Sequence, residues 1–301
     1  MKVLAVVVTY NRLELLKRTI KCLRETKNLD GIVVVNNDST DGTQAWLESQ
    51  EGLTVIHQAN VGGAGGFKTG MKYAYDAGAD WIWCMDDDVF PRPDCLGKLM
   101  SHCDDKEVGI MSPRRIMDGK IFTTEFKDFN LTDTFASTTV MPLRKIEVEN
   151  VTAISGAAFE GLFIRREVID KIGYPNDQLF IFYDDTDYCI RTLMAGYKII
   201  YVPEALMDKY KFFTDVTWIQ RAASKRWKRF YQIRNGAWFN HHYGKTAGVR
   251  NFRSIMTLSG YVGQAFILGL FTKAYRLKDT IGFIKAYNDG RQERLGKIDY
   301  L

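Results

Sequence analysis

Three consecutive carboxylates, Asp86, Asp87 and Asp88, directly follow an apolar and aromatic segment, Trp81 to Met85. Like charges this close repel one another unless a cation lies among them. Oxygen ligands suit Mg²⁺ or Mn²⁺ better than zinc, and these ions usually complete their coordination with substrate phosphates. We expect the alternate residues Asp86 and Asp88 to contact the metal; the alternative is a solvated acidic turn.

A glycine-rich segment, Asn60-Val61-Gly62-Gly63-Ala64-Gly65-Gly66, opens a predicted helix. It is neither a dinucleotide-binding fingerprint nor a P-loop. Glycines let a backbone approach a phosphate or sugar closely, and helix N-termini favour anions. The alternative is a tight turn from strand to helix, which needs only one or two glycines.

A second acidic cluster, Tyr183-Asp184-Asp185-Thr186-Asp187-Tyr188, begins another predicted helix after an apolar segment at 179–182. Helix N-termini tolerate carboxylates through capping and the helix dipole, which is the alternative explanation. A carboxylate that faces a partly dry cavity can act as a general base. Arg191, two turns further on, could pair with a carboxylate or meet a phosphate.

The first ninety residues contain the elements that would position these groups. Strand-like segments at 3–8, 32–35, 54–57 and 81–85 alternate with helical ones, which is typical of βαβ units and a largely parallel sheet. We expect Asn11 to cap the first helix. Because functional clefts in such sheets lie beyond the carboxyl ends of the strands, the polar loops should converge there.

The rest of the chain has a mixed pattern. Short strands are predicted at 108–112, 151–155, 161–165 and 198–202, helices at 168–173 and 184–195, and mainly helix beyond 212. We therefore expect an α/β domain over 1–210 and a helical region over 211–301. The apolar segment 258–271 is short and rich in glycine, which favours a core helix or one lying in a membrane interface over a spanning helix.

Charge is distributed unevenly along the 301 residues. Residues 205–301 hold 18 Lys/Arg and 6 Asp/Glu, a net of +12, whereas the preceding 204 carry 23 and 30, a net of −7. A basic region favours polyanionic partners. Five cysteines without a C-x-x-C pair argue against disulfides or a zinc site. The N-terminal sequence becomes polar after its first eight residues, which argues against a signal peptide. We expect a cytoplasmic protein.

Four ordered motifs resemble those of the inverting GT-A glycosyltransferases of family two: Val8-Thr9-Tyr10-Asn11-Arg12, Asn36 to Thr43, Asp86-Asp87-Asp88, and Asp184-Asp185 with Asp187 and Arg191. The resemblance implies a Rossmann-like sheet flanked by helices, Mn²⁺ or Mg²⁺ as cofactor, and a nucleotide-sugar donor. It implies Asp185 as the catalytic base. Donor-binding residues are then expected at Thr9, Tyr10, Asn11, Arg12, Asn37, Asp38, Asn60, Gly62, Gly63, Asp87 and Arg191, with acceptor-binding residues at Gly156, Ala157 and Asp184.

A narrower resemblance is to bacterial galactofuranosyltransferases, through Asn60 to Phe67, Met85 to Asp88 and Tyr183 to Tyr188. It implies UDP-galactofuranose as donor, although rhamnosyltransferases that use dTDP-rhamnose share similar glycine loops. Members of the family commonly place a metal-binding histidine where this chain has Asp208 and Lys209. We therefore expect Asp208 as a third metal ligand.

The expected reaction is a single displacement with inversion, with a glycan or lipid-linked glycan as acceptor. Peripheral contact with an anionic membrane at the inner face of the plasma membrane is expected, and nucleic acid is not an expected partner. One alternative is a nucleotidyltransferase, which leaves Asp184 and Asp185 without a task. Another is a non-catalytic nucleotide-sugar-binding or RNA-binding module, which needs neither a base nor a metal.

Overall fold

The computed structural model describes residues 1–122, 128–136, 149–212 and 216–300. Contacts divide the chain into two compact units. Unit 1 comprises Met1–Asp128, Val140–Asp177 and Asp185–Lys211, and unit 2 comprises Phe129–Thr139, Gln178–Asp184 and Phe212–Leu301. Unit 2 thus takes in two short upstream segments that a boundary at residue 210 does not anticipate.

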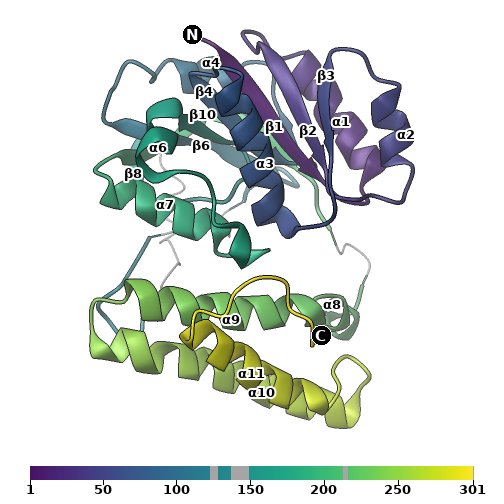
Figure 1. The fold of residues 1–301 in the computed structure, drawn as a ribbon, viewed down its shortest axis with the longest axis vertical. Helices are drawn as coiled ribbons and strands as arrows, with labels where there is room; N and C mark the ends of the chain where they lie inside the picture. Colours follow the sequence, from purple (N-terminus) through teal and green to yellow (C-terminus); the bar gives the residue numbers. More distant parts are fainter. Residues whose placement is uncertain (123–127, 137–148, 213–215, 301) are drawn as a thin grey trace. The chain divides into compact units, whose positions relative to one another are not determined.

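Unit 1 is built on one mixed sheet with the strand order β3-β2-β1-β4-β9-β6-β10-β5, in which β7 pairs with β6 and β8 with β10. The half formed by β3, β2, β1 and β4 is entirely parallel, and Figure 1 shows helices flanking the sheet. The expected α/β class is confirmed. The strands are β1 Val3–Thr9, β2 Gly31–Asn36, β3 Leu53–His57, β4 Trp81–Asp86, β5 Val89–Pro91, β6 Val108–Met117, β7 Lys120–Ile121, β8 Thr152–Ile154, β9 Leu162–Arg165 and β10 Lys198–Lys209.

The helices of this unit cover both faces of the sheet. They are α1 Leu13–Arg24, α2 Thr43–Glu48, α3 Gly62–Asp76, α4 Cys95–Met100, α6 Arg166–Ile172 and α7 Asp184–Met194, whose first residue is grouped with unit 2; the 3₁₀ turn Asp177–Leu179 precedes α7.

Strand β1 is buried along its whole length because its two faces pack on different helices. The odd-numbered Val3, Ala5 and Val7 share one core with buried leucines of α1. The even-numbered Val6 and Val8 face α3, where Cβ atoms added at Gly70 and Gly66 would lie 2.3 and 2.5 Å from their methyl groups. The alternation of side chains along a strand explains this division.

The carboxyl ends of the parallel strands meet at one edge of the sheet, as predicted. Thr9 at the end of β1 is in register with Asn36 at the end of β2, and Val8 with Asp86 at the end of β4. Asn36 is in turn in register with His57 at the end of β3. The four polar loops therefore start from neighbouring positions.

The other half of the sheet differs from the prediction in one respect that matters for the site. The strand predicted at 198–202 continues as β10 to Lys209, with an irregularity between Val202 and Leu206. Its last residues pair with β5, a short strand that the sequence pattern did not indicate. This pairing brings the end of β10 beside the acidic triplet.

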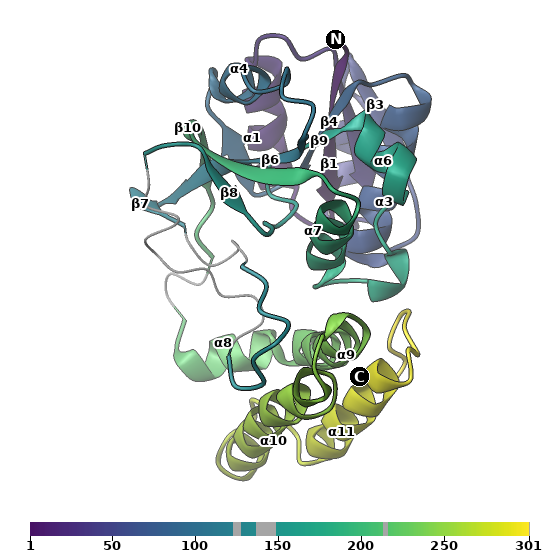
Figure 2. The same ribbon diagram turned by 90° about the vertical axis from the view of Figure 1, so that its left-hand side faces the viewer.

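Unit 2 is mainly helical. It contains α8 Trp218–Ser224, α9 Arg226–Tyr243, a π-helical turn at Val249–Arg253, α10 Ser254–Phe271 and α11 Lys278–Arg291. A core of aromatic and aliphatic side chains, including Phe230, Tyr231 and Phe283, joins α9, α10 and α11. Figures 1 and 2 both show α10 and α11 side by side.

Candidate functional site

Three carboxylates form a compact cluster at the polar edge of the sheet. Asp86, Asp88 and Glu160 each offer an oxygen, and these oxygens lie within 4.8 Å of one another. Asp86 ends β4, Asp88 lies in the turn that follows, and Glu160 precedes β9. The donor set is all oxygen and carries three charges, which fits Mg²⁺ or Mn²⁺. The two aspartates were predicted from the sequence, and Glu160 was not.

Strand pairing explains why Glu160 joins the aspartates. In the antiparallel pair of β4 and β9, Cys84 faces Leu162. Continuing that register by two residues sets Glu160 opposite Asp86. Gly161 permits the turn, because its φ is +102° and an added Cβ would lie 2.4 Å from the sulfur of Met207. A residue with a side chain at this position would displace Glu160 or Met207.

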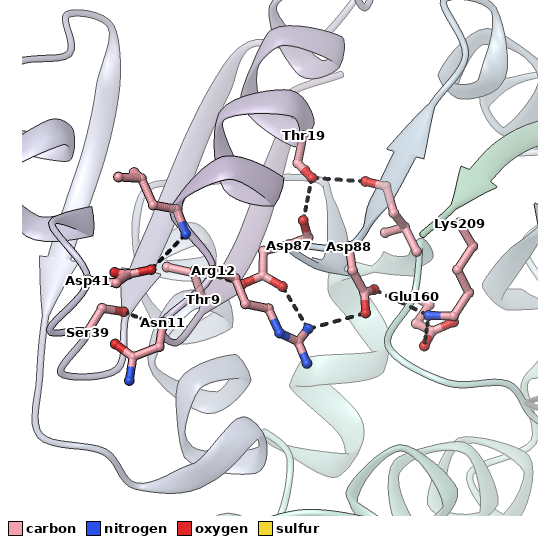
Figure 3. Close-up of polar contacts among 12 residues, drawn as sticks. Thr9, Asn11, Arg12, Thr19, Ser39, Asp41, Asp87, Asp88, Glu160 and Lys209 are labelled. Carbon is pink, nitrogen blue, oxygen red and sulfur yellow. Dashed lines mark hydrogen bonds and ion pairs between the residues drawn. The ribbon is translucent and has the colours of Figure 1, made fainter. Parts of the chain in front are cut away.

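Positive side chains contact the cluster, and Figure 3 shows two of them, Arg12 beside Asp88 and Lys209 beside Glu160. The Nζ atom of Lys209 lies 2.7 Å from Glu160 and 3.3 Å from Asp88, and the buried guanidinium of Arg115 pairs with Glu160. The Nη1 atom of Arg12 lies 3.0 Å from Asp87 and 3.2 Å from Asp88.

This arrangement sets four carboxylates, counting Asp87, against three cations, so one negative charge is not neutralised. Burial raises the pKa of Asp86 well above its usual value, and the neighbouring Asp88 and Glu160 add to the rise. Burial also raises the pKa of Asp87 to about 6, although Arg12 opposes the shift. The excess of buried negative charge is what a divalent cation would relieve.

Glu160 behaves differently from the aspartates. Burial alone would raise its pKa, but Arg115 and Lys209 outweigh burial and hold the pKa of Glu160 below its usual value. The carboxylate is therefore ionised and already attracts cations.

Asp208, the third metal ligand expected from the sequence, lies outside this cluster. Its carboxylate pairs with Arg92, with Nη2 2.9 Å from Oδ1. Successive residues of a strand point to opposite faces, so Lys209 rather than Asp208 faces the aspartates. The expectation followed from the place of a histidine in similar proteins, just after a strand predicted to end at 202; the strand continues to Lys209, which faces Asp88 instead.

The Thr9 to Arg12 segment, predicted to bind the donor, is held against the acidic triplet. Thr9 Oγ1 donates to the carboxylate of Asp87 at 2.7 Å, and Thr19 in α1 donates to the main-chain carbonyl of Asp87 at 2.9 Å. The Arg12 side chain is about one third exposed. Tyr10 is exposed. The segment thus joins the acidic triplet to the open edge of the sheet.

Asn11 does not cap the first helix as expected. Its φ is +53°, and its side-chain oxygen accepts a hydrogen bond from the amide of Thr40 at 2.6 Å. The amide of Leu13, at the start of α1, donates instead to Asp41 at 2.9 Å. A cap from the neighbouring loop replaces the local one and ties the first two polar loops together.

The second and third polar loops are also linked. The side-chain amide of Asn37 donates to the carbonyl of Gly62 at 3.0 Å and accepts from Gln58 at 2.7 Å. Asn60 accepts from the amide of Gly62 at 3.0 Å. Asp38, with a φ of +67°, follows Asn37 in a tight turn.

Some of the glycines after Asn60 are needed for packing. Helix α3 begins at Gly62, so this segment is its first turn rather than a separate loop. Gly66 is in close contact with β1, whereas nothing lies within 4 Å of a Cβ added at Gly63. A side chain at Gly63 would therefore point into open space.

Helix α7 carries the second acidic cluster. Asp184 is buried, and the carboxylate of Asp185 accepts hydrogen bonds from the amide and hydroxyl of Thr186 at 2.5 and 2.9 Å. Further along, the ring of Tyr188 lies 5.9 Å from that of Phe159. This face of α7 packs on the residues that lead into Glu160.

Arg191 is engaged in contacts within the fold. Its guanidinium contacts Asp187 at 2.8 Å and donates to the carbonyls of Ile172 and Tyr174 at 2.7 and 3.1 Å. Ala157, expected near the acceptor, is fully buried, and Gly156 beside it is buried too. The carbonyl of Ala157 accepts a hydrogen bond from the thiol of Cys189 at 3.6 Å. The contacts of Arg191 and Cys189 hold α7 against the neighbouring segments of unit 1.

The segment before Asp184 has a backbone that no sequence pattern indicated. Phe180, Phe182 and Tyr183 have φ values of 65°, 65° and 66°, which bulky residues rarely adopt and which functional sites often retain. In unit 2 the side-chain amide of Asn235 donates to the carbonyls of residues 179, 181 and 182, each at 2.9 Å. Buried Arg234 also contacts the carbonyl of Leu179 at 3.1 Å.

Comparison with known proteins agrees with this geometry. The family model described as Glycosyl transferase family 2 matches residues 4–173. The chain is 28% identical over 213 residues to galactofuranosyltransferase GlfT1 of Mycolicibacterium smegmatis, covering 64% of this chain and 66% of that protein. It is 26% identical over 238 residues to the dTDP-rhamnosyl transferase RfbF of Shigella flexneri, covering 77% of each.

Two solved structures share the fold. GalNAc-T7 with UDP, GalNAc and Mn²⁺ superposes with a TM-score of 0.58 at 14% identity, over 85% of this chain and 54% of that one. The mannosyltransferase PcManGT from Pyrobaculum calidifontis, in complex with GDP-Man and Mn²⁺, superposes with a TM-score of 0.53 at 15% identity, over 97% of this chain and 88% of that one.

Proposed function

Because the chain belongs to glycosyl transferase family 2, we propose that this glycosyltransferase moves galactofuranose from UDP-galactofuranose to a glycan or lipid-linked glycan. The galactofuranosyltransferase relatives support this donor. The observation that carries the proposal is the cluster of Asp86, Asp88 and Glu160 at the edge where the polar loops meet.

The carboxylates of Asp86, Asp88 and Glu160 would hold the metal, with Glu160 replacing Asp208 as the third ligand. A bound Mn²⁺ or Mg²⁺ supplies positive charge to the departing diphosphate. Arg12, rather than Arg191, is the guanidinium we assign to the diphosphate, since the Arg12 side chain is partly exposed beside the cluster. Thr9, Asn37 and Asp38 would hold the nucleotide, and Gly63 offers space for the donor.

Asp185 is the proposed general base. Its carboxylate takes the proton of the acceptor hydroxyl while the hydroxyl oxygen bonds to the anomeric carbon and the bond from that carbon to the diphosphate breaks. A single displacement inverts the anomeric configuration. The hydrogen bonds from the amide and hydroxyl of Thr186 fix the position of the Asp185 carboxylate.

The test is to incubate the protein with Mn²⁺ and either UDP-galactofuranose or dTDP-rhamnose and to follow donor loss by hydrolysis, in which water takes the place of the acceptor hydroxyl. Asp185→Asn should lower turnover by roughly 10²–10⁴, the usual effect of losing a general base, and donor binding measured by thermal shift should persist. Asp76→Asn, on the exposed side of α3, is the matched control. Full turnover by Asp185→Asn would remove this residue from the mechanism.

Rhamnosyl transfer is the second candidate, because the RfbF relative matches a larger share of both chains than GlfT1 does. Turnover of dTDP-rhamnose without turnover of UDP-galactofuranose would establish it. Binding of either donor without any donor loss would instead favour a non-catalytic module.

A further inference from the structure

Helices α10 and α11 of unit 2 expose an unusual amount of apolar surface. Among the described residues, ten of the twenty-one exposed large hydrophobic side chains lie between 252 and 284. Single exposed apolar residues are ordinary, but a concentration of them marks an interaction surface. These side chains are Phe252, Ile255, Met256, Phe266, Ile267, Leu270, Phe271, Leu277, Ile281 and Ile284.

The exposed side chains recur at helical spacing and gather where the two helices join. On α10, Leu270 and Phe271 lie three and four residues after Ile267, and Phe271 is 81% exposed. On α11, Ile281 and Ile284 continue the series that Leu277 begins. A Cβ added at Gly269 would lie 3.3 Å from Leu277, so the two series meet at the connection between the helices.

Only one edge of α10 is used for packing within unit 2. Ala265 and Leu268 are buried in the core that α10 shares with α9 and α11. By length and composition alone, Val249–Phe271 could cross a bilayer. Only 17% of its apolar window is buried within the protein, so most of the segment is left uncovered. Ser254–Phe271 contains no charged residue.

The exposed charged residues within 250–292 all carry positive charge. Within 250–292, every residue of which the structure describes, the acidic residues are Asp279 and Asp289, and both are buried. Asp279 pairs with Arg226 and Arg276. The exposed charged residues of this stretch are basic: Arg250, Lys273, Arg276, Lys278 and Lys285.

We propose that this apolar and basic surface of α10 and α11 docks on a membrane that contains anionic lipids. The apolar side chains would enter the boundary between headgroups and acyl chains, and the lysines and arginines would contact lipid phosphates. The charge pattern favours this occupant over a second copy of the chain, whose identical surface would bring like charges together. Lys278 and Lys285 flank the apolar side chains of α11, as basic residues do in helices that lie in a membrane interface.

The test is flotation of the full chain with vesicles of phosphatidylcholine alone or with phosphatidylglycerol added. Binding should require phosphatidylglycerol and weaken as salt rises. Replacing Phe271 and Ile281 together by Gln should lower the partition coefficient by at least about 10-fold. Met194→Gln, an equally exposed apolar residue of α7, is the matched control and should float like the unmodified protein, with circular dichroism confirming that each variant is folded.

Absence of flotation at low salt would overturn the proposal, as would flotation that the double variant leaves unchanged. Self-association in sedimentation, abolished by the same variant, would identify a second copy as the occupant. Resistance to alkaline carbonate extraction would identify a spanning helix. Flotation needs no donor, so failure here leaves the proposed transferase activity untouched, and failure of the donor assay leaves this proposal untouched.

Discussion

Both units bury arginines, and Arg115 of unit 1 has a different kind of partner from Arg234 and Arg253 of unit 2. In unit 1, Arg115 faces the carboxylate of Glu160. In unit 2, Arg234 and Arg253 donate to main-chain carbonyls, such as those of Leu179 and Asn130, and burial lowers their pKa values. A carbonyl partner fixes the backbone, whereas a carboxylate partner also leaves an anion that a metal can share. Arg115 therefore points to a binding site in unit 1, whereas Arg234 and Arg253 hold the backbone of unit 2, as Arg165 does in unit 1 through the carbonyls of Val108 and Cys103.

The largest expected effect tests this contrast directly. Arg115→Met leaves Glu160 buried with less positive charge around it, so the free energy of unfolding should fall by about 3–5 kcal/mol in urea. Mn²⁺ should restore part of the loss, because Glu160 is one of the proposed metal ligands. Arg234→Met should also destabilise the protein, but Mn²⁺ should not correct it. Equal recovery of both variants would remove the distinction between the units.

Close glycine contacts extend the comparison to packing. A Cβ at Gly70 in unit 1 would meet a methyl group of Val6, whereas one at Gly290 in unit 2 would lie 2.0 Å from the main-chain oxygen of Arg234. A side chain can rotate and a backbone must shift, so Gly70→Ala should cost about 1–3 kcal/mol and Gly290→Ala more. Gly97→Ala, with nothing near its Cβ, is the control. Thermal denaturation measures both losses of stability. A smaller loss for Gly290→Ala than for Gly70→Ala would contradict the prediction.

Asn235 tests how unit 2 holds the segment before the proposed base. Asn235→Ala removes the donor to three carbonyls and should lower stability by about 1–3 kcal/mol. It should also lower kcat more than it raises KM for the donor, since residues 180–183 lead directly into Asp184. Asn251→Ala, whose amide contacts a carbonyl on the exposed side of unit 2, should change neither. An unchanged kcat would make Asn235 structural only.

The smallest expected effect concerns Lys209. Lys209→Met leaves the four carboxylates with two cations, so Mn²⁺ should bind the metal-free protein about 10-fold more tightly, a change of ~1.4 kcal/mol. Mn²⁺ titration followed by electron paramagnetic resonance measures this without any substrate. Lys211→Met, which removes an exposed ion pair with Asp118, should leave the affinity unchanged. Weaker binding in Lys209→Met would show that the ammonium helps the metal.

Sequence patterns sufficed for the features that depend on local periodicity. The parallel strands, their order of appearance and the convergence of their polar ends follow from apolar runs that end in polar clusters. Glu160 and Lys209 escaped prediction because antiparallel pairing, not local pattern, brings them to Asp86 and Asp88. The left-handed backbone at Phe180 was equally hidden, since its aromatic neighbours resemble an ordinary apolar segment. The prediction that Asp208, and not Lys209, faces the acidic cluster assumed that the strand ends at 202, whereas it continues to Lys209.

The three cations around the acidic cluster also bear on how the protein matures. A chain that brings its own ammonium and guanidinium groups to its carboxylates can complete folding before any divalent ion arrives. We therefore expect the supply of manganese or magnesium in the cell to set the fraction of molecules that is loaded, while the amount of folded protein stays constant.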